Sequence, residues 1–156
     1  MDTQSRMTES ERINELLRSA KTIAVVGLSD NPLRVSYDVS YYMQSQGYRI
    51  LPVNPMIVEA LGEKAYPTLS DVREKIDVVN VFRRSEFVAA IVDETIRLRL
   101  PAIWMQEGVI DEAAAEKARA AGIFVVMDRC ILKEHRRLLR EGIAPRRQGE
   151  LRGTDF

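Results

Sequence analysis

Short, nearly continuous apolar runs recur along the chain, and stretches with helical spacing of apolar residues separate them. Such runs, rich in β-branched side chains, are typical of strands that helices cover on both faces of a sheet. Their alternation with helical stretches is typical of βαβ units and a mainly parallel sheet. The pattern predicts five strands, at Thr22–Val26, Tyr48–Val53, Asp77–Phe82, Ala102–Met105 and Ile123–Met127.

The stretches between these runs carry signals for the start and the end of helices. Thr8 and Glu11 have the spacing of a capping box, in which each side chain bonds the other residue's backbone N–H. Gly47 and Gly122 follow helical patterns, and glycine readily adopts the positive φ of a C-terminal cap. We expect a helix after Thr8, helices over 36–46, 85–99, 111–121 and 130–140, and a short one within 69–75, with Ser85 and Asp111 as N-terminal caps.

The order of these elements predicts an α/β fold. The 156 residues suit one domain, and we expect it to span 1–144, with a polar C-terminal tail over 145–156. Right-handed crossovers would give a Rossmann-like, doubly wound parallel sheet of five strands with helices on both faces. With strands numbered along the chain, we expect the order 3-2-1-4-5, which places a ligand site where the order reverses, between strands one and four.

Charge and rare residues narrow the functional classes. Lys plus Arg and Asp plus Glu both number 23, so nothing global attracts nucleic acid or an anionic membrane. No apolar run approaches the length of a spanning helix, and Met1 to Arg12 lacks an apolar signal core. A single cysteine, Cys130, excludes an intrachain disulfide framework. We expect a soluble, cytoplasmic protein with a small-molecule ligand, and a homodimer is common enough among small proteins to be kept open.

The turn after the first strand predicts a phosphate site. Gly27 lets the chain turn closely, Ser29 and Ser36 offer hydroxyls, and Arg34 adds a fixed charge. The first amides of the following helix carry the positive end of its dipole. Only one glycine stands here, so the three-glycine dinucleotide fingerprint is absent. A plain strand-to-helix turn is the structural alternative.

The second strand ends in Val53, Asn54 and Pro55. An NAD-binding Rossmann domain usually places an acidic residue here for the ribose hydroxyls, so asparagine argues against NAD. Because proline fixes the backbone, Pro52 and Pro55 suggest a rigid wall for adenosine or phosphate. The alternative is that they only set the loop leading to Tyr66.

The remaining strand ends offer further candidates for a ligand site. Phe82 and Arg83 follow the third strand, and guanidinium groups match phosphates and stack on flat rings. Gln106 is the better candidate after the fourth strand, since Trp104 fits the core. Arg129 and Cys130 follow the fifth.

Neither Cys130 nor His135 points to catalysis or a metal. A thiol near a helix start can have a depressed pKa, but buried unreactive cysteine is commoner. The single histidine has no cysteine or histidine partner for a metal, and the spacing indicates no Ser-His-Asp or Cys-His arrangement. No catalytic residue is assigned.

Four motifs, in order at successive strand ends, resemble those of the small stand-alone CoA-binding proteins. These proteins are similar to the N-terminal, Rossmann-like CoA-binding domain of the succinyl-CoA synthetase α subunit. The resemblance covers roughly Glu11 to Arg140. The motifs are Val25-Val26-Gly27-Leu28-Ser29, Pro52-Val53-Asn54-Pro55, Trp104-Met105-Gln106 and Asp128-Arg129-Cys130.

The resemblance implies that the chain binds coenzyme A or an acyl-CoA without catalysing a reaction, as a carrier, sensor or regulator. The chain has no room for the synthetase's second domain with its phosphorylated histidine. The phosphate turn of this chain also has fewer glycines than that of the synthetase. The resemblance assigns the CoA phosphates to Gly27, Ser29 and Arg34 with Ser36 as a helper, the adenosine to Val53, Asn54 and Pro55, the nucleotide border to Phe82 and Arg83, and the far strand ends to Gln106, Arg129 and Cys130.

Two other classes stay open. An NAD(P)-dependent oxidoreductase or a minimal acyl-CoA enzyme is weakened by the missing acidic residue, the missing glycine fingerprint and the absence of a recognisable acid, base or nucleophile set. A protein-interaction module that uses the fold without a ligand is the third possibility.

Overall fold

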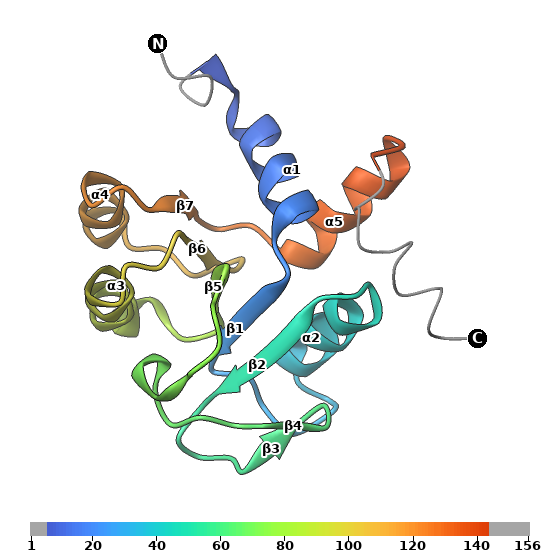
Figure 1. The fold of residues 1–156 in the computed structure, drawn as a ribbon, viewed down its shortest axis with the longest axis vertical. Helices are drawn as coiled ribbons and strands as arrows, with labels where there is room; N and C mark the ends of the chain where they lie inside the picture. Colours follow the sequence, from blue (N-terminus) through green and yellow to red (C-terminus); the bar gives the residue numbers. More distant parts are fainter. Residues whose placement is uncertain (1–5, 144–156) are drawn as a thin grey trace.

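The computed structural model describes residues 6–143, so the tail predicted over 145–156 lies outside the described residues. Helices and strands alternate along the chain, and a small hairpin and two 3₁₀ turns are added between them (Figure 1). The elements are α1 (Glu9–Ser19), β1 (Thr22–Val26), α2 (Val35–Ser45), β2 (Arg49–Val53), β3 (Glu59–Ala60), β4 (Glu63–Lys64), η2 (Leu69–Asp71), β5 (Val78–Val81), η3 (Ser85–Phe87), α3 (Val88–Arg97), β6 (Ala102–Met105), α4 (Glu112–Ala120), β7 (Phe124–Val126) and α5 (Ile131–Arg140).

The five long strands form one parallel sheet with helices on both faces, which confirms the predicted fold class. Alternate residues of a strand enter opposite cores, because successive side chains point to opposite faces. In β1, Ala24 and Val26 pack with α3 and α4, whereas Ile23 and Val25 pack with α1, α2 and α5. Figure 1 shows these two helical layers on either side of the sheet.

Most helix ends follow the predicted caps. The Thr8 hydroxyl accepts a bond from the Glu11 N–H at 3.1 Å, and the Glu11 carboxylate accepts one from the Thr8 N–H at 2.9 Å. Asp111 caps α4 through the N–H of Ala114, at 3.0 Å. Ser85 is different: it begins the 3₁₀ turn η3, and its hydroxyl accepts a bond from Ile110 N–H in the loop after β6.

The predicted strand order is wrong. The sheet runs β2-β1-β5-β6-β7, which is 2-1-3-4-5 when the five strands are numbered along the chain, and not 3-2-1-4-5. After β2 the chain does not continue outward; it forms the β3–β4 hairpin and η2 and then returns to the free side of β1. The order therefore reverses between β1 and β5, which is where an open α/β sheet forms its crevice.

Pro52 supplies a physical reason for this order. Proline has no N–H to donate to a neighbour, so within sheets it is found mainly on edge strands. In the expected order the second strand would have had neighbours on both sides, whereas β2 is the edge strand of the sheet. The Pro52 carbonyl accepts a bond from the Tyr66 N–H at 2.9 Å, and Tyr66 also forms an isolated bridge to Val53.

The β3–β4 hairpin escaped the pattern analysis. Its strands have two residues each, and Leu61 and Gly62 between them have φ values of 55° and 77°. Two positive φ values suit a two-residue hairpin turn, but a leucine seldom adopts one. The sequence therefore carries no clear turn signal at this position.

Candidate functional site

Gly27 lies where the ends of three strands meet. Its φ is +92°, and a Cβ added to it would come within 2.5 Å of the Phe82 carbonyl oxygen and 2.9 Å of Cδ of Arg83. Its N–H donates to the carbonyl of Val53, at 2.9 Å. The turns after β1, β2 and β5 are thus brought together, and only a glycine fits between them.

Two serine hydroxyls hold the turn after β1 against the start of α2. The Ser36 hydroxyl accepts a bond from the Ser29 N–H at 3.0 Å, and the Ser29 hydroxyl accepts one from the Asn31 N–H at 3.0 Å. Ser36 is buried in the first turn of α2. Each hydroxyl still has its own O–H to donate.

Arg34 immediately precedes α2 and has an extended backbone. Its side chain is exposed, and within residues 6–143 its guanidinium has neither an ion-pair nor a hydrogen-bond partner. It lies beside the amides of the first helical turn, where the helix dipole already favours negative charge. The residue is therefore a cation available to an anionic ligand.

Asn54 ties the turn after β2 to the turn after β1. Its side-chain N–H donates to the carbonyl of Leu28 at 3.0 Å, and its side-chain oxygen accepts a bond from Met56 N–H at 2.9 Å. Both ends of the amide are therefore bonded to backbone, which fixes the turn after β2 against the turn after β1. Of its neighbours, Val53 is buried and Pro55 is exposed.

Arg83 lies on the other side of Gly27, at the end of β5. Its guanidinium carbon is 4.0 Å from the centre of the Phe87 ring, an arrangement that orients the charge without neutralising it. Phe82 is half-buried and packs, like Cys130, against the core of α1, α2 and α5. The reversal point of the sheet is therefore bordered by one stacked guanidinium and one aromatic ring.

Gln106 follows β6 and is buried. Its amide N–H donates to the side-chain oxygen of Asn80 at 2.8 Å. Asn80, in β5, is 1% exposed and was not among the predicted site residues. A polar residue inside an otherwise apolar strand was the signal that could have found it, because buried polar groups need partners.

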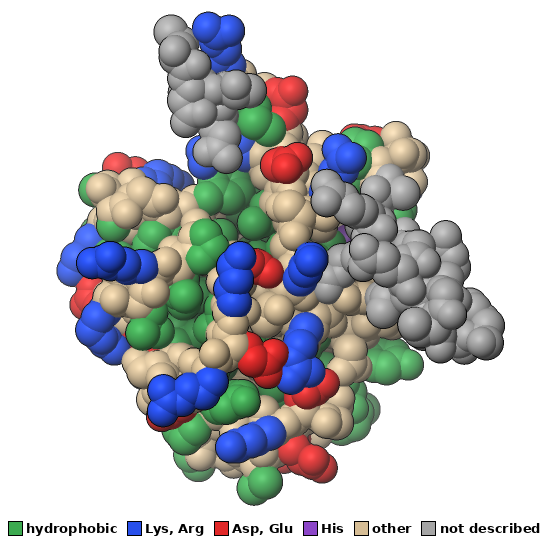
Figure 2. Space-filling view, viewed as in Figure 1, with side chains coloured by type: hydrophobic (Ala, Val, Ile, Leu, Met, Phe, Trp, Pro, Cys, Tyr) green, Lys and Arg blue, Asp and Glu red, His purple; other side chains and the backbone are tan. Residues whose placement is uncertain are grey.

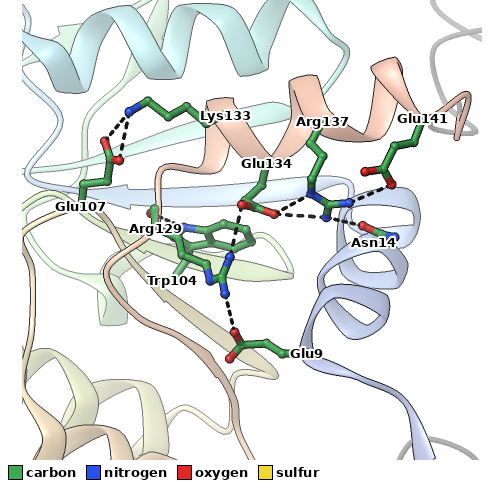
Figure 3. A network of polar contacts seen from close by, with 9 residues as sticks. All are labelled: Glu9, Asn14, Trp104, Glu107, Arg129, Lys133, Glu134, Arg137 and Glu141. Atoms are coloured by element: carbon green, nitrogen blue, oxygen red, sulfur yellow. Dashed lines mark hydrogen bonds and ion pairs between the residues drawn. The ribbon is translucent and has the colours of Figure 1, made fainter.

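Arg129 already has carboxylate partners within the chain. Its guanidinium bonds Glu9 of α1 at 2.9 Å and Glu134 of α5 at 3.4 Å, while its backbone carbonyl accepts a bond from the Trp104 indole N–H at 2.8 Å (Figure 3). The structure does not bring this guanidinium together with Arg34 and Arg83. Its charge is used to join α1 and α5.

The N-terminal turn of α5 carries a second paired cation. Lys133 lies 3.0 Å from a carboxylate oxygen of Glu107 in the loop after β6 (Figure 3). The hydrogen bond with Glu107 raises the pKa of Lys133 above its usual value. Cys130 is the residue before α5; it is half-buried, a free thiol, and its side chain makes no capping bond.

His135 connects α5 to α2. It is fully buried in α5, and its Nδ1 lies 2.9 Å from the hydroxyl of Tyr42 in α2. Its Nε2 is buried and has no hydrogen-bond partner in the described structure. Burial lowers the pKa of His135 to about 4, so the imidazole is neutral at pH 7.

The described surface adds two findings. Figure 2 shows positive and negative side chains interspersed over the visible face, and not one broad field of a single sign. Within residues 6–143, no helix is long and apolar enough to cross a membrane, and no group of three or more His, Cys, Asp or Glu side chains is arranged to hold a metal ion.

Residues 21–136 match the family model described as the CoA binding domain. The chain belongs to this CoA-binding family. The resemblance drawn from the four strand-end motifs is thereby confirmed. The match spans all five long strands and begins after α1.

Relatives of this CoA-binding domain include proteins of similar size. The uncharacterized protein YneT of Bacillus subtilis (strain 168) is 47% identical over 123 residues, which cover 79% of this chain and 91% of that protein. A solved hypothetical protein from Pyrococcus horikoshii OT3 is 36% identical, with a TM-score of 0.81 and coverage of 89% and 97% of the two chains.

The same fold also occurs inside a longer protein. The apo form of a dinucleotide-forming acetyl-coenzyme A synthetase from Ca. Korarchaeum cryptofilum matches with a TM-score of 0.64 and 24% identity. The match covers 74% of this chain but 28% of that one. It concerns the architecture of one part of the synthetase.

Proposed function

We propose that this protein binds coenzyme A or an acyl-CoA in the crevice at the carboxyl ends of β1 and β5. One observation carries the proposal: Gly27 lies against the turn of Arg83, while the unpaired guanidinium of Arg34 stands at the start of α2. Backbone amides at a helix start, a close turn and two cations are the features that hold a pyrophosphate.

The proposed ligand runs along the carboxyl edge of the sheet. The phosphates contact Gly27, Ser29 and Arg34, and the wall formed by Val53, Asn54 and Pro55 supports the adenosine. The pantetheine arm then passes Phe82 towards Gln106 and Cys130. An apolar crevice with a few convergent polar groups is the usual form of a small-molecule site.

We propose a binding role without turnover, as a carrier, sensor or regulator of CoA in the cytoplasm. Asn54 supports CoA over NAD, since its amide is bonded at both ends to backbone and is not an acidic acceptor for ribose hydroxyls. Incubation with acetyl-CoA, followed by chromatography of the thioester, tests the role: loss of the thioester above the buffer rate would show an acyl-CoA enzyme.

Calorimetric titration of the full chain with CoA, NAD and ADP in parallel tests the ligand. We expect CoA to bind most tightly, because it adds the pantetheine arm and a further phosphate to what ADP offers. Tighter binding of NAD than of CoA would contradict the proposal. Absence of binding by all three ligands would favour a protein-interaction module.

A further inference from the structure

Large apolar side chains are exposed beside the crevice. Leu33 and Val35, around the start of α2, are 92% and 69% exposed, and Met56 and Val58, between β2 and β3, are 86% and 85% exposed. Single exposed apolar residues are ordinary on a protein surface. A contiguous group of them marks a surface that something covers.

These residues lie on two segments whose preceding turns are joined. The bond from the Asn54 side chain to the Leu28 carbonyl holds their two segments together, at 3.0 Å. Beside them a groove of about 610 Å³ runs between α2, with Tyr37 and Tyr41, and the β3–β4 hairpin. In Figure 1 the hairpin and α2 lie on the same side of the sheet edge. We call the surface formed by 30–41 and 56–62 the α2–hairpin face.

The α2–hairpin face carries charges of both signs that find no partner among residues 6–143. Asp30 and Glu59 line the groove. Neither carboxylate, nor the guanidinium of Arg34, has a side-chain partner among the described residues. Two carboxylates in the groove repel a phosphate, so the groove itself does not suit the nucleotide.

We propose that the α2–hairpin face is the interface of a two-fold homodimer. A two-fold axis brings the same patch of two copies together, so that residue i of one copy contacts residue j of the other and the reverse. Leu33, Val35, Met56 and Val58 then bury one another, while Arg34 of each copy faces the unpaired carboxylates of its partner copy. The charge pattern is self-complementary, which an interface between identical chains requires.

The interface borders the proposed ligand site and competes with it for Arg34, because a guanidinium that faces the carboxylates of the partner copy is less available to a phosphate. Arg34 is shared by both, because one guanidinium lies in the turn after β1 and on the α2–hairpin face. The test therefore uses ligand-free protein, and dimer formation is read independently of CoA binding.

Sedimentation velocity of the full chain over a range of concentrations tests the apolar part. We expect a dimer for the wild type and at least about a tenfold increase in the dissociation constant for the Met56→Glu, Val58→Glu double variant. Ile110→Glu is the control, since Ile110 is exposed in the loop after β6 and outside this face. It should dimerise like the wild type.

A charge exchange tests the pairing. Two variants are made, one with Arg34→Glu and the other with both Asp30→Arg and Glu59→Arg. Each variant alone should form a weaker homodimer, because like charges then face each other. An equimolar mixture should form heterodimers, because each contact again joins opposite charges. A monomeric wild type, or a dimer that the double glutamate variant leaves intact, would overturn the proposal. A failure of the mixture to associate would do the same if both variants are folded by circular dichroism.

Discussion

The carboxyl edge of the sheet has two halves, one at β1 and β5 and the other at β6 and β7, and they differ in whether carboxylates of the chain pair with their cations. At β1 and β5, the guanidinium of Arg34 has no partner within the described chain, and Arg83 is only stacked on a ring. At β6 and β7, Arg129 is bonded to Glu9 and Glu134, and Lys133 to Glu107. Cations that are already paired bind added anions less readily than unpaired ones.

The difference in pairing predicts which half of the edge binds a phosphate. Arginine residues occur at both ends of the edge, so charge alone does not separate them. What separates them is whether a carboxylate of the chain itself reaches the guanidinium. In the proposed binding mode, the β1–β5 half takes the anionic part of CoA, and the β6–β7 half, whose cations are paired, takes the uncharged arm.

Among the substitutions in the β1–β5 half, Gly27→Ala should cause the largest loss of stability. The added Cβ meets the Phe82 carbonyl and is strained by the positive φ, so we expect about 4 kcal/mol lower stability in urea unfolding. Gly108→Ala is the matched control, because its φ is +82° but nothing lies within 4 Å of its Cβ. It should cost about 1–2 kcal/mol. Equal losses for both variants would mean that contact with β5 does not matter.

The pH dependence of stability tests the buried contact between His135 of α5 and Tyr42 of α2. The folded pKa of His135, about 4, lies below the ordinary histidine value of 6.5, so protonation favours the unfolded chain. Stability is full above pH 6.5 and falls with pH, by about 2 kcal/mol between pH 6.5 and 5 and by about 3 kcal/mol at pH 4. Urea unfolding at each pH measures this slope. It should be absent from His135→Gln between pH 6.5 and 5, and an unchanged slope there would assign it to other groups.

The contrast between the arginines predicts different effects on binding. Arg34→Ala should weaken CoA binding by about 2 kcal/mol and leave adenosine binding unchanged, since it removes one charge-assisted phosphate contact. Arg129→Ala should have a smaller effect on CoA, because its guanidinium is bonded to Glu9 and Glu134. Calorimetry compares the two, with Arg18→Ala on the exposed side of α1 as a control. A larger loss for Arg129→Ala would reverse the assignment of the halves.

The smallest effect is expected at the ion pair between Lys133 and Glu107. Both side chains are mostly exposed, at 67% and 55%, so Glu107→Gln should leave stability in urea unfolding nearly unchanged. The same variant removes the carboxylate partner of Lys133, so that the β6–β7 half then has an unpaired cation, as the β1–β5 half does. Sharper salt dependence of CoA binding in Glu107→Gln would show that the freed ammonium reaches the ligand; an unchanged dependence would place it out of reach.

Local patterns were sufficient to predict the five long strands and the helices between them, but not the β3–β4 hairpin. The capping box of Thr8 and Glu11 and the cap at Asp111 were read from spacing, because each interaction spans only three residues. The five strands were predicted from apolar runs, with ends within two residues of those observed. Burial on both faces leaves a signal that any single sequence contains.

Long-range choices could not be predicted in the same way. The position of β5 beside β1 depends on pairing between distant segments, and Pro52 was the one local clue to the edge strand. The direction of Arg129 depends on Glu9, which lies 120 positions away. Asn54 was selected because it follows the second strand, but its two bonds to backbone depend on how the turns meet.

The pairing of β1 with β5 has a consequence for how the protein matures. Its register joins segments about 55 positions apart, and Gly27 acquires its neighbours at Phe82 and Arg83 only when this pairing exists. A ribosome-bound chain that has exposed only the first two strands therefore has no crevice. A ligand that contacts the turns after both β1 and β5 stabilises this late-forming pairing selectively. A bound ligand would therefore slow the local separation of β1 from β5 more than the separation of the outer strands.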